Sequence, residues 1–313
     1  SDVYKRQEVY IMKKSICILL SAFLTLSALP LNTFANDKII ANEYKNGTNY
    51  VTVEKSVEEN MSDREKAAVE KFNELYKNGK IPENIAESEL YDIVNNLVYG
   101  ELYQQGQLTD KDREMISLAA LTTLGTTTIL KTHVYSALNA GLTPVEITET
   151  VYHCAPYVGA AKSLEAINVV NDVFKEKGIK IPESQATVTE ESRFDDGSSA
   201  QTKLFGNLGD TKPADGEVRL GRSFLPDYCF GDFYTRKGLT LEQHELLTWV
   251  CIATLGGAES QLTGHTNGNK NVGKSKDYML EVLTDIMPYI GYPRTLNALN
   301  IINTVYDLSL IHI

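Results

Sequence analysis

Cysteine is scarce in this sequence. The 313 residues include four cysteines, and no two of them have the CxxC spacing. Disulfide-dense scaffolds and zinc sites built from cysteines need more cysteines at closer spacing. We therefore expect no disulfide framework and no metal site, although Cys229 and Cys251 could oxidise as a single pair outside a cell.

Positive charge is also in short supply. Lysine and arginine number 30 against 41 aspartates and glutamates, which gives a formal net charge of -11. No basic cluster stands out along the chain, so an electrostatic footprint for nucleic acid is missing. The expected partners are a small-molecule substrate and other copies of this chain.

Long apolar runs are absent except near the N-terminus. Residues 12–35 have a basic head, an apolar run from Ile16 to Leu29, and a small residue at Ala35. This pattern predicts a secretory signal peptide cut after Ala35, and hence an exported protein. The run is shorter than the roughly 20 residues that a membrane span needs, so we expect no stable span after cleavage.

Both ends of the chain resemble translated adaptor sequence rather than protein. They read SDVYKRQ at the start and LSLIHI at the end. We therefore expect residues 1–11 and 308–313 to be non-native and Met12 to be the start. Residues 36–60 show no clear pattern, apart from a short alternation at 50–53, and are predicted to form a loose leader.

The rest of the chain is a tandem duplication. Several residues recur at a spacing of 132, and others recur at 131 because one residue is gained between them. Two copies are too few for a solenoid and suggest paired domains, which we place at 61–182 and, including a linker, at 183–307. The recurring pairs are His133 and His265, Pro156 and Pro288, Tyr157 and Tyr289, Gly159 and Gly291, and, at 131, Glu114 and Glu245.

Each copy reads as helical. Thr109 followed by Asp112 predicts a helix start, and the apolar segment after it stops at Gly125. A helix that is apolar on nearly all sides is expected to be buried. Thr143-Pro144 with Glu146 reads as a capping box that opens another helix. No long alternating pattern competes, so the predicted fold class is all-α.

The motifs of both copies resemble the carboxymuconolactone decarboxylase family. In the first copy they are DRE, AALTTLG, ALNAGLT and APYVG; in the second they are YCFGDFYTR, ATLGG and MPYIGYPRTLNALN. The resemblance covers about residues 89–307. It implies two tandem helical domains of the alkyl hydroperoxidase D type, and a homotrimer that imitates the hexamer of single-domain relatives.

A peroxidase of this fold would need a CxxC pair just before the histidine, because a low-pKa thiolate attacks the peroxide. The matching positions hold no thiol: they are Thr126 and Ile129 in the first copy, and Ala258 and Gln261 in the second. A peroxiredoxin-type antioxidant is therefore the less favoured interpretation. Cys154 remains a candidate contact for a substrate, although a cysteine on a helix face is more often core packing.

The decarboxylase branch of the family requires a group that protonates an enolate-like intermediate. By resemblance, the candidate catalytic residues are Glu114 with His133 and Glu245 with His265, acting without a cofactor. Glu101 and Asp232 are second-rank candidates, since either could simply cap a helix or face solvent. Because Arg113 could bind an acidic substrate and His244 replaces it in the second copy, we expect the first site to be the one that takes an acid. The alternative is an exported scaffold or binder that has kept the pocket and lost the reaction.

Overall fold

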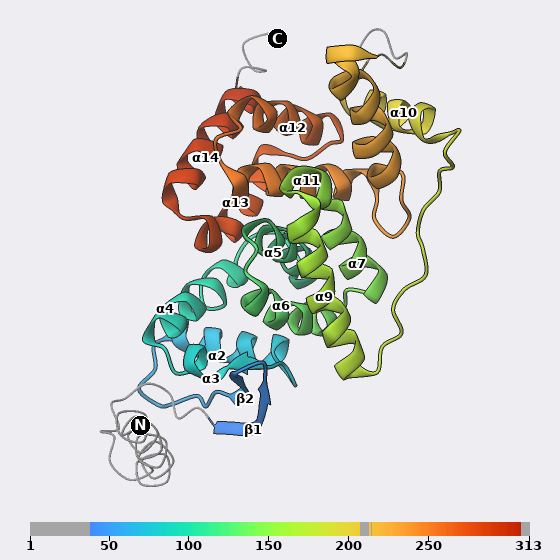
Figure 1. Cartoon of the computed structure of the whole chain (residues 1–313). Helices are drawn as coiled ribbons and strands as arrows, with labels where there is room; N and C mark the ends of the chain where they lie inside the picture. Colours follow the sequence, from blue (N-terminus) through green and yellow to red (C-terminus); the bar gives the residue numbers. More distant parts are fainter. Residues whose placement is uncertain (1–37, 207–212, 214, 308–313) are drawn as a thin grey trace, which may run out of the picture. The chain divides into compact units, whose positions relative to one another are not determined.

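A computed structural model describes residues 38–206, 213 and 215–307 (Figure 1). The predicted signal peptide and both predicted non-native ends lie outside these residues. Within them the chain is mainly helical, and the family model matches it in two successive segments, which confirms the all-α class and the tandem arrangement. The residues that the structure describes belong to one compact unit.

The first repeat unit begins with a small sheet and continues with helices; its helices in the described residues are α2 (Asp63–Leu75), α3 (Glu83–Ala86), α4 (Glu89–Val98), η1 (Leu102–Gln104), α5 (Asp110–Leu124), α6 (Thr127–Asn139), α7 (Pro144–His153), α8 (Ala155–Val158) and α9 (Ala160–Lys177). The second consists of α10 (Arg193–Phe205), η2 (Gly216–Val218), η3 (Leu220–Tyr234), α11 (Leu241–Leu255), α12 (Glu259–Asn271), α13 (Lys276–Ile290) and α14 (Tyr292–Asp307). The helix η3 has π-type hydrogen bonding. By sequence position, α5 corresponds to α11, α6 to α12 and α9 to α14.

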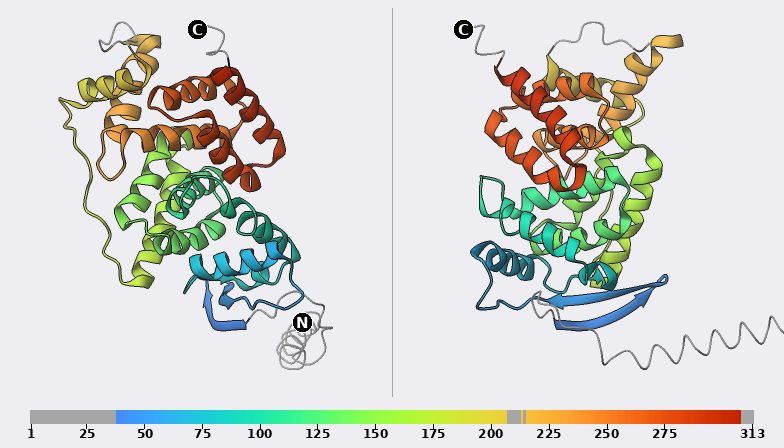
Figure 2. Two further views of the ribbon diagram at one scale, coloured as in Figure 1. Left: turned by 180° about the vertical axis from the view of Figure 1, so that it is seen from behind. Right: turned by 90° about the vertical axis from the view of Figure 1, so that its left-hand side faces the viewer.

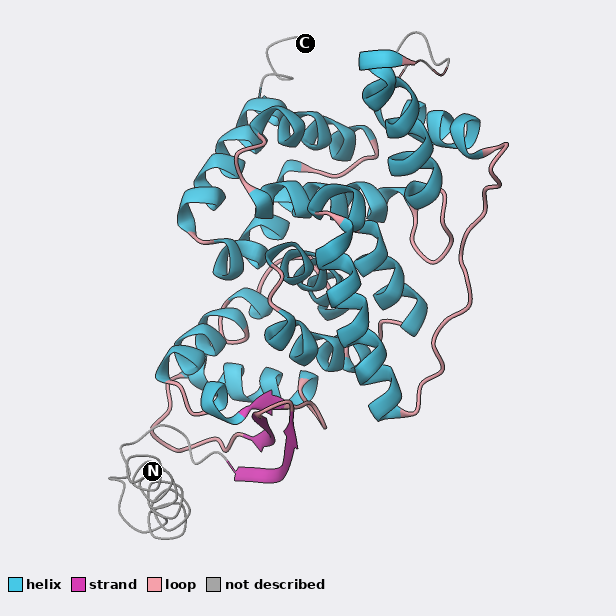
Figure 3. Cartoon of the chain, in the orientation of Figure 1, coloured by secondary structure: helices cyan, strands magenta, loops and turns pink. Residues whose placement is uncertain are grey.

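The prediction of a loose leader over 36–60 is wrong for most of that segment (Figure 3). Strands β1 (Lys38–Lys45) and β2 (Thr48–Glu54) form an antiparallel hairpin, and the two-residue β3 (Ile81–Pro82) pairs with β2. Asn46 and Gly47 both have positive φ, 52° and 80°, as a two-residue type I′ turn requires. Val51 is fully buried, so the short apolar alternation marks the strand of the hairpin that faces a core.

A linker joins the two repeat units by running along one side of them (Figures 1 and 2). It starts after α9, where Gly178 closes the helix in a left-handed conformation, and reaches α10 at Arg193. Two hydrogen bonds hold it against the end of η3: the Lys237 N–H donates to the Gln185 carbonyl (3.0 Å), and Thr187 Oγ1 donates to the Thr235 carbonyl (2.8 Å). The linker is therefore part of the packed structure.

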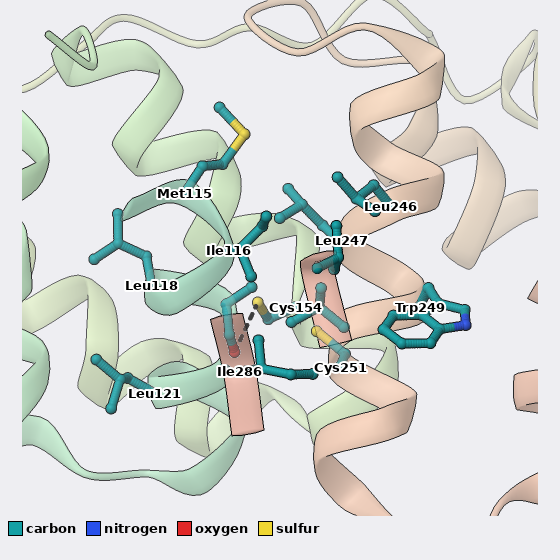
Figure 4. Close-up of a cluster of buried hydrophobic side chains, with 14 of the residues drawn as sticks. Met115, Ile116, Leu118, Leu121, Cys154, Leu246, Leu247, Trp249, Cys251 and Ile286 are labelled. Atoms are coloured by element: carbon teal, nitrogen blue, oxygen red, sulfur yellow. Dashed lines mark hydrogen bonds between the residues drawn. The ribbon is translucent and has the colours of Figure 1, made fainter. Parts of the chain in front are cut away.

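The two repeat units share one hydrophobic core, with α5 and α11 in contact at its centre. Each of these helices begins with a capping box, one at Thr109, where the sequence predicts a helix start, and one at Thr240. Side chains of both helices meet there, together with Ile286 of α13 and Cys154 (Figure 4). The packing explains why the two sequences are apolar nearly all round.

Polar pairs cross between the repeat units at equivalent positions. On one side the buried Arg113 Nη1 lies 3.0 Å from Asp285 Oδ1. At the matching place on the other side, His244 Nδ1 lies 3.0 Å from His153 Nδ1. An ion pair in one half is thus replaced by two histidines in the other, and both pairs are buried.

Two glutamates, each one helical turn before His153 or Asp285, also make equivalent contacts between the repeat units. Glu149 of α7 accepts two hydrogen bonds from Arg236, at 2.6 and 2.9 Å. Its counterpart Glu281 of α13 accepts from the backbone N–H groups of Gln107 and Leu108, at 2.7 and 3.1 Å. Each unit therefore anchors the turn that precedes the central helix of the other.

No helix within 38–206 or 215–307 has both the length and the apolar character needed to cross a bilayer.

The histidine pair makes stability sensitive to acid. Burial lowers the pKa of His244 to about 4 and that of His153 well below its usual value. The unfolded chain therefore binds more protons between about pH 6.5 and 4, so the free energy of unfolding falls as the pH drops through that window. For His244 alone the loss is about 3 kcal/mol. Urea unfolding followed by circular dichroism across this range measures it.

The double variant His153→Asp, His244→Arg provides the comparison, because it copies the Arg113–Asp285 pair and removes both titrating imidazoles. We expect this variant to lose much less stability between pH 6.5 and 4 than the original chain. An equal acid dependence in the two proteins would contradict the assignment to the histidine pair.

Candidate functional site

The first repeat unit places Glu114 and His133 side by side. Glu114 lies in α5 and His133 in α6, and the two helices pack so that His133 Nδ1 is 2.9 Å from Glu114 Oε2. The other carboxylate oxygen accepts hydrogen bonds from Tyr103 (3.0 Å) and Ser136 (2.8 Å). The carboxylate accepts a hydrogen bond from Nδ1 and so fixes the histidine tautomer. Nδ1 must carry the proton, and Nε2 is the nitrogen that can exchange a proton with a substrate.

A tyrosine of the second repeat unit covers this histidine. The Tyr289 hydroxyl in α13 lies 3.3 Å from His133 Nε2, and the two rings meet edge to face with centroids 5.7 Å apart. The side chain of His133 is only 4% exposed and Glu114 is fully buried. The atom expected to exchange protons is therefore capped by the other half of the chain.

The second repeat unit builds the same pair. Glu245 of α11 and His265 of α12 are joined by a bond of 2.9 Å between Oε1 and Nδ1, and Tyr234 donates to Oε2 at 2.8 Å. Burial raises the pKa of Glu245, and its bond to His265 opposes that shift. Tyr157 of the first unit faces the His265 ring with centroids 6.3 Å apart. Each pair thus has a tyrosine from the opposite unit nearby.

The two pairs differ in access. The side chain of His265 is 17% exposed, about four times the value for His133. No hydrogen bond to Nε2 of His265 comes from the residues that the structure describes, so this nitrogen is available to a substrate. Tyr157 instead places its hydroxyl 3.2 Å from Cys229 Sγ.

A glycine makes room for the second carboxylate. Gly268 stands where the first unit has Ser136, and a Cβ at this position would lie 2.1 Å from Glu245 Oε1. The second glutamate has therefore lost the serine donor and has moved into the space that the side chain would fill. Glycine inside a helix normally lowers its stability, whereas Gly268 has a packing role at this place in α12.

A chain of hydrogen bonds joins the second pair to the buried histidines between the units. Tyr234 lies 2.6 Å from Thr248 Oγ1, which lies 2.9 Å from His153 Nε2. Tyr234 donates to Glu245, Thr248 also donates to the His244 carbonyl at 3.1 Å, and His244 Nε2 lies 3.5 Å from the Arg236 carbonyl. The second pair is thus connected to two buried imidazoles, whereas the first unit has Arg113 and Asp285 in their place.

Arg113 does not reach a substrate in this structure. Its guanidinium binds Asp285, the Gln105 carbonyl (2.6 Å) and the Leu108 carbonyl (3.3 Å), and its side chain is 3% exposed. Burial raises the pKa of Asp285 to about 7, with Arg113 opposing the shift. The charge predicted to bind an acid is already paired, because the second unit supplies a carboxylate that the spacing within one unit does not reveal.

Glu101 and Asp232 lie away from the two histidines, at equivalent places in the fold. Glu101 forms an exposed ion pair with Arg64 (2.8 Å), and Asp232 pairs with Arg193 (2.5 Å). Each carboxylate thus ties a first helix, α2 or α10, to the helix or turn beside it. The sequence left open a helix cap or a solvated carboxylate, and the structure shows an ion pair between elements for both residues.

Cys154 is buried in the shared core beside Cys251 (Figure 4). A hydrogen bond with Cys251 and burial together raise the pKa of Cys154 well above the usual range. Burial also raises the pKa of Cys229, to about 11. All three cysteines in the described residues are free thiols, and neither Cys154 nor Cys229 has the low pKa of a reactive thiol.

The tyrosines are the site residues that the sequence interpretation missed. Tyr103 and Tyr234 donate to the two glutamates, and Tyr157 and Tyr289 face the two histidines. A signal was present, because both pairs recur at the spacing of the repeat. In the described ranges no three histidine, cysteine, aspartate or glutamate side chains converge as metal ligands would.

Comparison with known proteins matches one segment in each repeat unit to the same family. The sequence profile of the carboxymuconolactone decarboxylase family matches residues 88–172 and 223–304, more than half of the chain. The 4-carboxymuconolactone decarboxylase of Acinetobacter baylyi is 29% identical over 91 residues, which cover 29% of this chain and 68% of that protein. The nitrosuccinic acid decarboxylase of Metarhizium robertsii is 29% identical over 97 residues, 30% of this chain and 68% of that protein.

Two glycines of α12 provide a matched test of the packing at the second pair. Gly268→Ala forces Glu245 or Phe205 to move, so we expect it to lower the free energy of unfolding by about 1 to 3 kcal/mol. Gly264→Ala meets nothing within 4 Å and should raise it by about 0.5 to 1 kcal/mol, as alanine does in a helix. Denaturant unfolding of both variants distinguishes them, and shifts of the same sign and size would contradict the packing role of Gly268.

Proposed function

This chain belongs to the carboxymuconolactone decarboxylase family, and from that premise we propose that it decarboxylates a small acid with a glutamate–histidine pair as the source of the proton. The observation that carries the proposal is the bond between each glutamate and histidine Nδ1, which is 2.9 Å in both repeat units. A histidine held in this way presents Nε2 as its acid and base atom.

The chemistry needs one proton for each turnover. The bond between the substrate carbon and its carboxylate breaks, and carbon dioxide leaves while the electron pair passes into a neighbouring electron-accepting group. The carbon then takes a proton from Nε2–H of the protonated histidine, and solvent restores that proton. The glutamate accepts the Nδ1–H bond and so keeps the ring oriented for the transfer.

The substrate class follows from what the two named relatives have in common. One acts on a carboxylated lactone and the other on nitrosuccinic acid, and in both molecules a carbonyl or a nitro group can hold the released electron pair. We therefore propose a small acid whose carboxylate is lost toward such a group. Because the substrate itself accepts the electrons, the reaction needs no cofactor.

We assign the working site to the second repeat unit rather than to the first, which the sequence favoured for Arg113. Two observations support this choice: the greater exposure of His265 and its open Nε2. At the first pair Tyr289 covers Nε2 and Asp285 occupies Arg113. The first pair then serves to hold α5 and α6 together.

The N-terminal sequence supports export of this protein, as proposed above for residues 12–35. An exported decarboxylase of this family would meet its substrate outside the cytoplasm. The competing interpretation is an exported non-catalytic binder with the same leader and the same glutamate–histidine pairs. Only a measurement of turnover distinguishes the two.

Measurement of carbon dioxide release by the full chain tests the proposal, with γ-carboxymuconolactone and nitrosuccinate as substrates at neutral pH. His265→Ala should lower kcat/KM by about a hundredfold or more, as the loss of a general acid does. His133→Ala, the matched change in the first unit, should leave it within a few-fold. Asn267→Ala, two residues further along α12 and exposed, is the control, since within the described residues its side chain bonds only the Thr263 carbonyl.

The outcomes separate the alternatives. Loss of turnover in His133→Ala alone would move the working site to the first unit. If both histidine variants kept the turnover of the original chain, the proposed role of the pair would be wrong. A folded chain that releases no carbon dioxide from either acid would favour the non-catalytic binder.

A second proposal concerns assembly: we infer a homotrimer, as the family resemblance implies. Support comes from Leu90 and Ile93, one turn apart on α4 and exposed by 68% and 59%. Light scattering should give three times the mass of one chain, and the double variant Leu90→Asp, Ile93→Asp should lower that mass. Ile181→Asp in the linker, equally apolar and 55% exposed, should not. A monomeric original chain would contradict the trimer.

A further inference from the structure

Two tyrosines cross the boundary between the repeat units at equivalent places but bond to different partners. Tyr157 of α8 and Tyr289 of α13 recur at the spacing of 132. The Tyr289 hydroxyl lies 3.3 Å from His133 Nε2, whereas the Tyr157 hydroxyl lies 3.2 Å from Cys229 Sγ. The same side chain therefore bonds an imidazole at the first site and a thiol at the second.

A contact that both tyrosines share does not explain this difference. Tyr157 has a hydrogen bond with Thr248 of α11, and Tyr289 has one with Ser117 of α5. Thr248 and Ser117 recur at the spacing of 131, and both have a hydroxyl group. The central helix of the opposite unit thus contacts both tyrosines in the same way, so the choice between thiol and imidazole depends on another group.

The residue that differs is Cys229 in η3. Its counterpart in α4, at the spacing of 131, is Val98. Both side chains are buried. A thiol can donate and accept weak hydrogen bonds, whereas the side chain of valine can do neither. In the first unit, the histidine nitrogen is therefore the partner that remains for the tyrosine hydroxyl.

The imidazole of the second site could accept the same bond. His265 Nδ1 faces Glu245 and carries the proton, so Nε2 has a free lone pair. The ring centroids of Tyr157 and His265 are 6.3 Å apart, against 5.7 Å for the pair in the first unit. A Tyr157 that lost its thiol partner would need only a short movement to bond Nε2.

The surroundings of Cys229 explain why a thiol suits this place. Cys229 packs with Leu204, Phe230 and other apolar side chains in a small buried cluster. A thiol behaves there as a small hydrophobic group and still offers one weak hydrogen bond. Burial raises the pKa of Cys229 to about 11, so the thiol stays protonated and uncharged near neutral pH.

We propose that Cys229 is a positioning residue of the second site, because its thiol holds the Tyr157 hydroxyl away from His265 Nε2 and keeps that nitrogen accessible to a substrate. The thiol itself forms no bond to the substrate. The first site, with valine at the equivalent position, is closed by its tyrosine. The relevance of Cys229 to turnover rests on the proposed decarboxylation.

Labelling of the full chain with diethyl pyrocarbonate tests the proposal, because this reagent modifies an accessible, unprotonated imidazole nitrogen. The rate at His265 is measured by mass spectrometry at neutral pH. Cys229→Val, which copies Val98, should lower that rate by about fivefold, the factor by which one hydrogen bond shifts an equilibrium. Cys229→Ala should lower it too, whereas Cys229→Ser keeps a hydrogen-bonding group and should stay within about twofold of the original rate.

A second change shows whether Tyr157 is the group that closes the site. Adding Tyr157→Phe to Cys229→Val should restore the rate at His265, since phenylalanine cannot bond Nε2. Cys251→Val is the control for the loss of a buried thiol, because Cys251 is fully buried in the shared core, and it should leave the rate unchanged. Thermal melting should show that each variant is folded.

An unchanged rate at His265 in both Cys229→Val and Cys229→Ala would overturn the proposal. So would an equal fall in Cys251→Val, or a fall that Tyr157→Phe does not reverse. The label needs no substrate, so a failure of the proposed decarboxylation and a failure of the role of Cys229 are distinguishable.

Discussion

Packing of α5 against α11 is the contact on which the rest of the molecule depends. The two helices are buried almost all round and form the centre of a single core that contains residues of both repeat units. They also carry the glutamates of both pairs, so the carboxylates are held by helices at the centre of the core. Burial of apolar area at this contact supplies the free energy that keeps charged and polar groups in the interior.

Around this contact the two halves have diverged in their polar groups while keeping their helices. Where one side has the arginine and aspartate of an ion pair, the other has two histidines at the same depth. Removing one partner of a buried ion pair leaves an unpaired charge, whereas exchanging both partners avoids that cost. The two positions therefore had to change together, and the change put titratable groups in contact with the second glutamate through Thr248 and Tyr234.

Duplication within one chain gives each repeat unit a fixed neighbour, and the sites use it. Tyr289 lies over His133, and Tyr157 lies beside His265, so each histidine has an aromatic wall from the other unit. Two identical chains would impose the same arrangement on both sites. A tandem chain is free of that symmetry, and here one histidine is covered while the other is partly open.

The sequence by itself determined the family, the helical class, the duplication and the two glutamate–histidine pairs. The helical class and the duplication follow from caps, periodicity and recurring segments, which depend on residues close together in the chain, whereas the family and the two pairs follow from the resemblance of the motifs. It did not reveal the hairpin at 38–54, although Asn46-Gly47 marks the turn, because only one short strand has a buried face. Only the tertiary structure decided that Arg113 is paired, that Gly268 makes room for Glu245 and that Tyr289 covers His133. Each of these depends on a contact between elements distant in sequence, and two of the three cross from one repeat unit to the other.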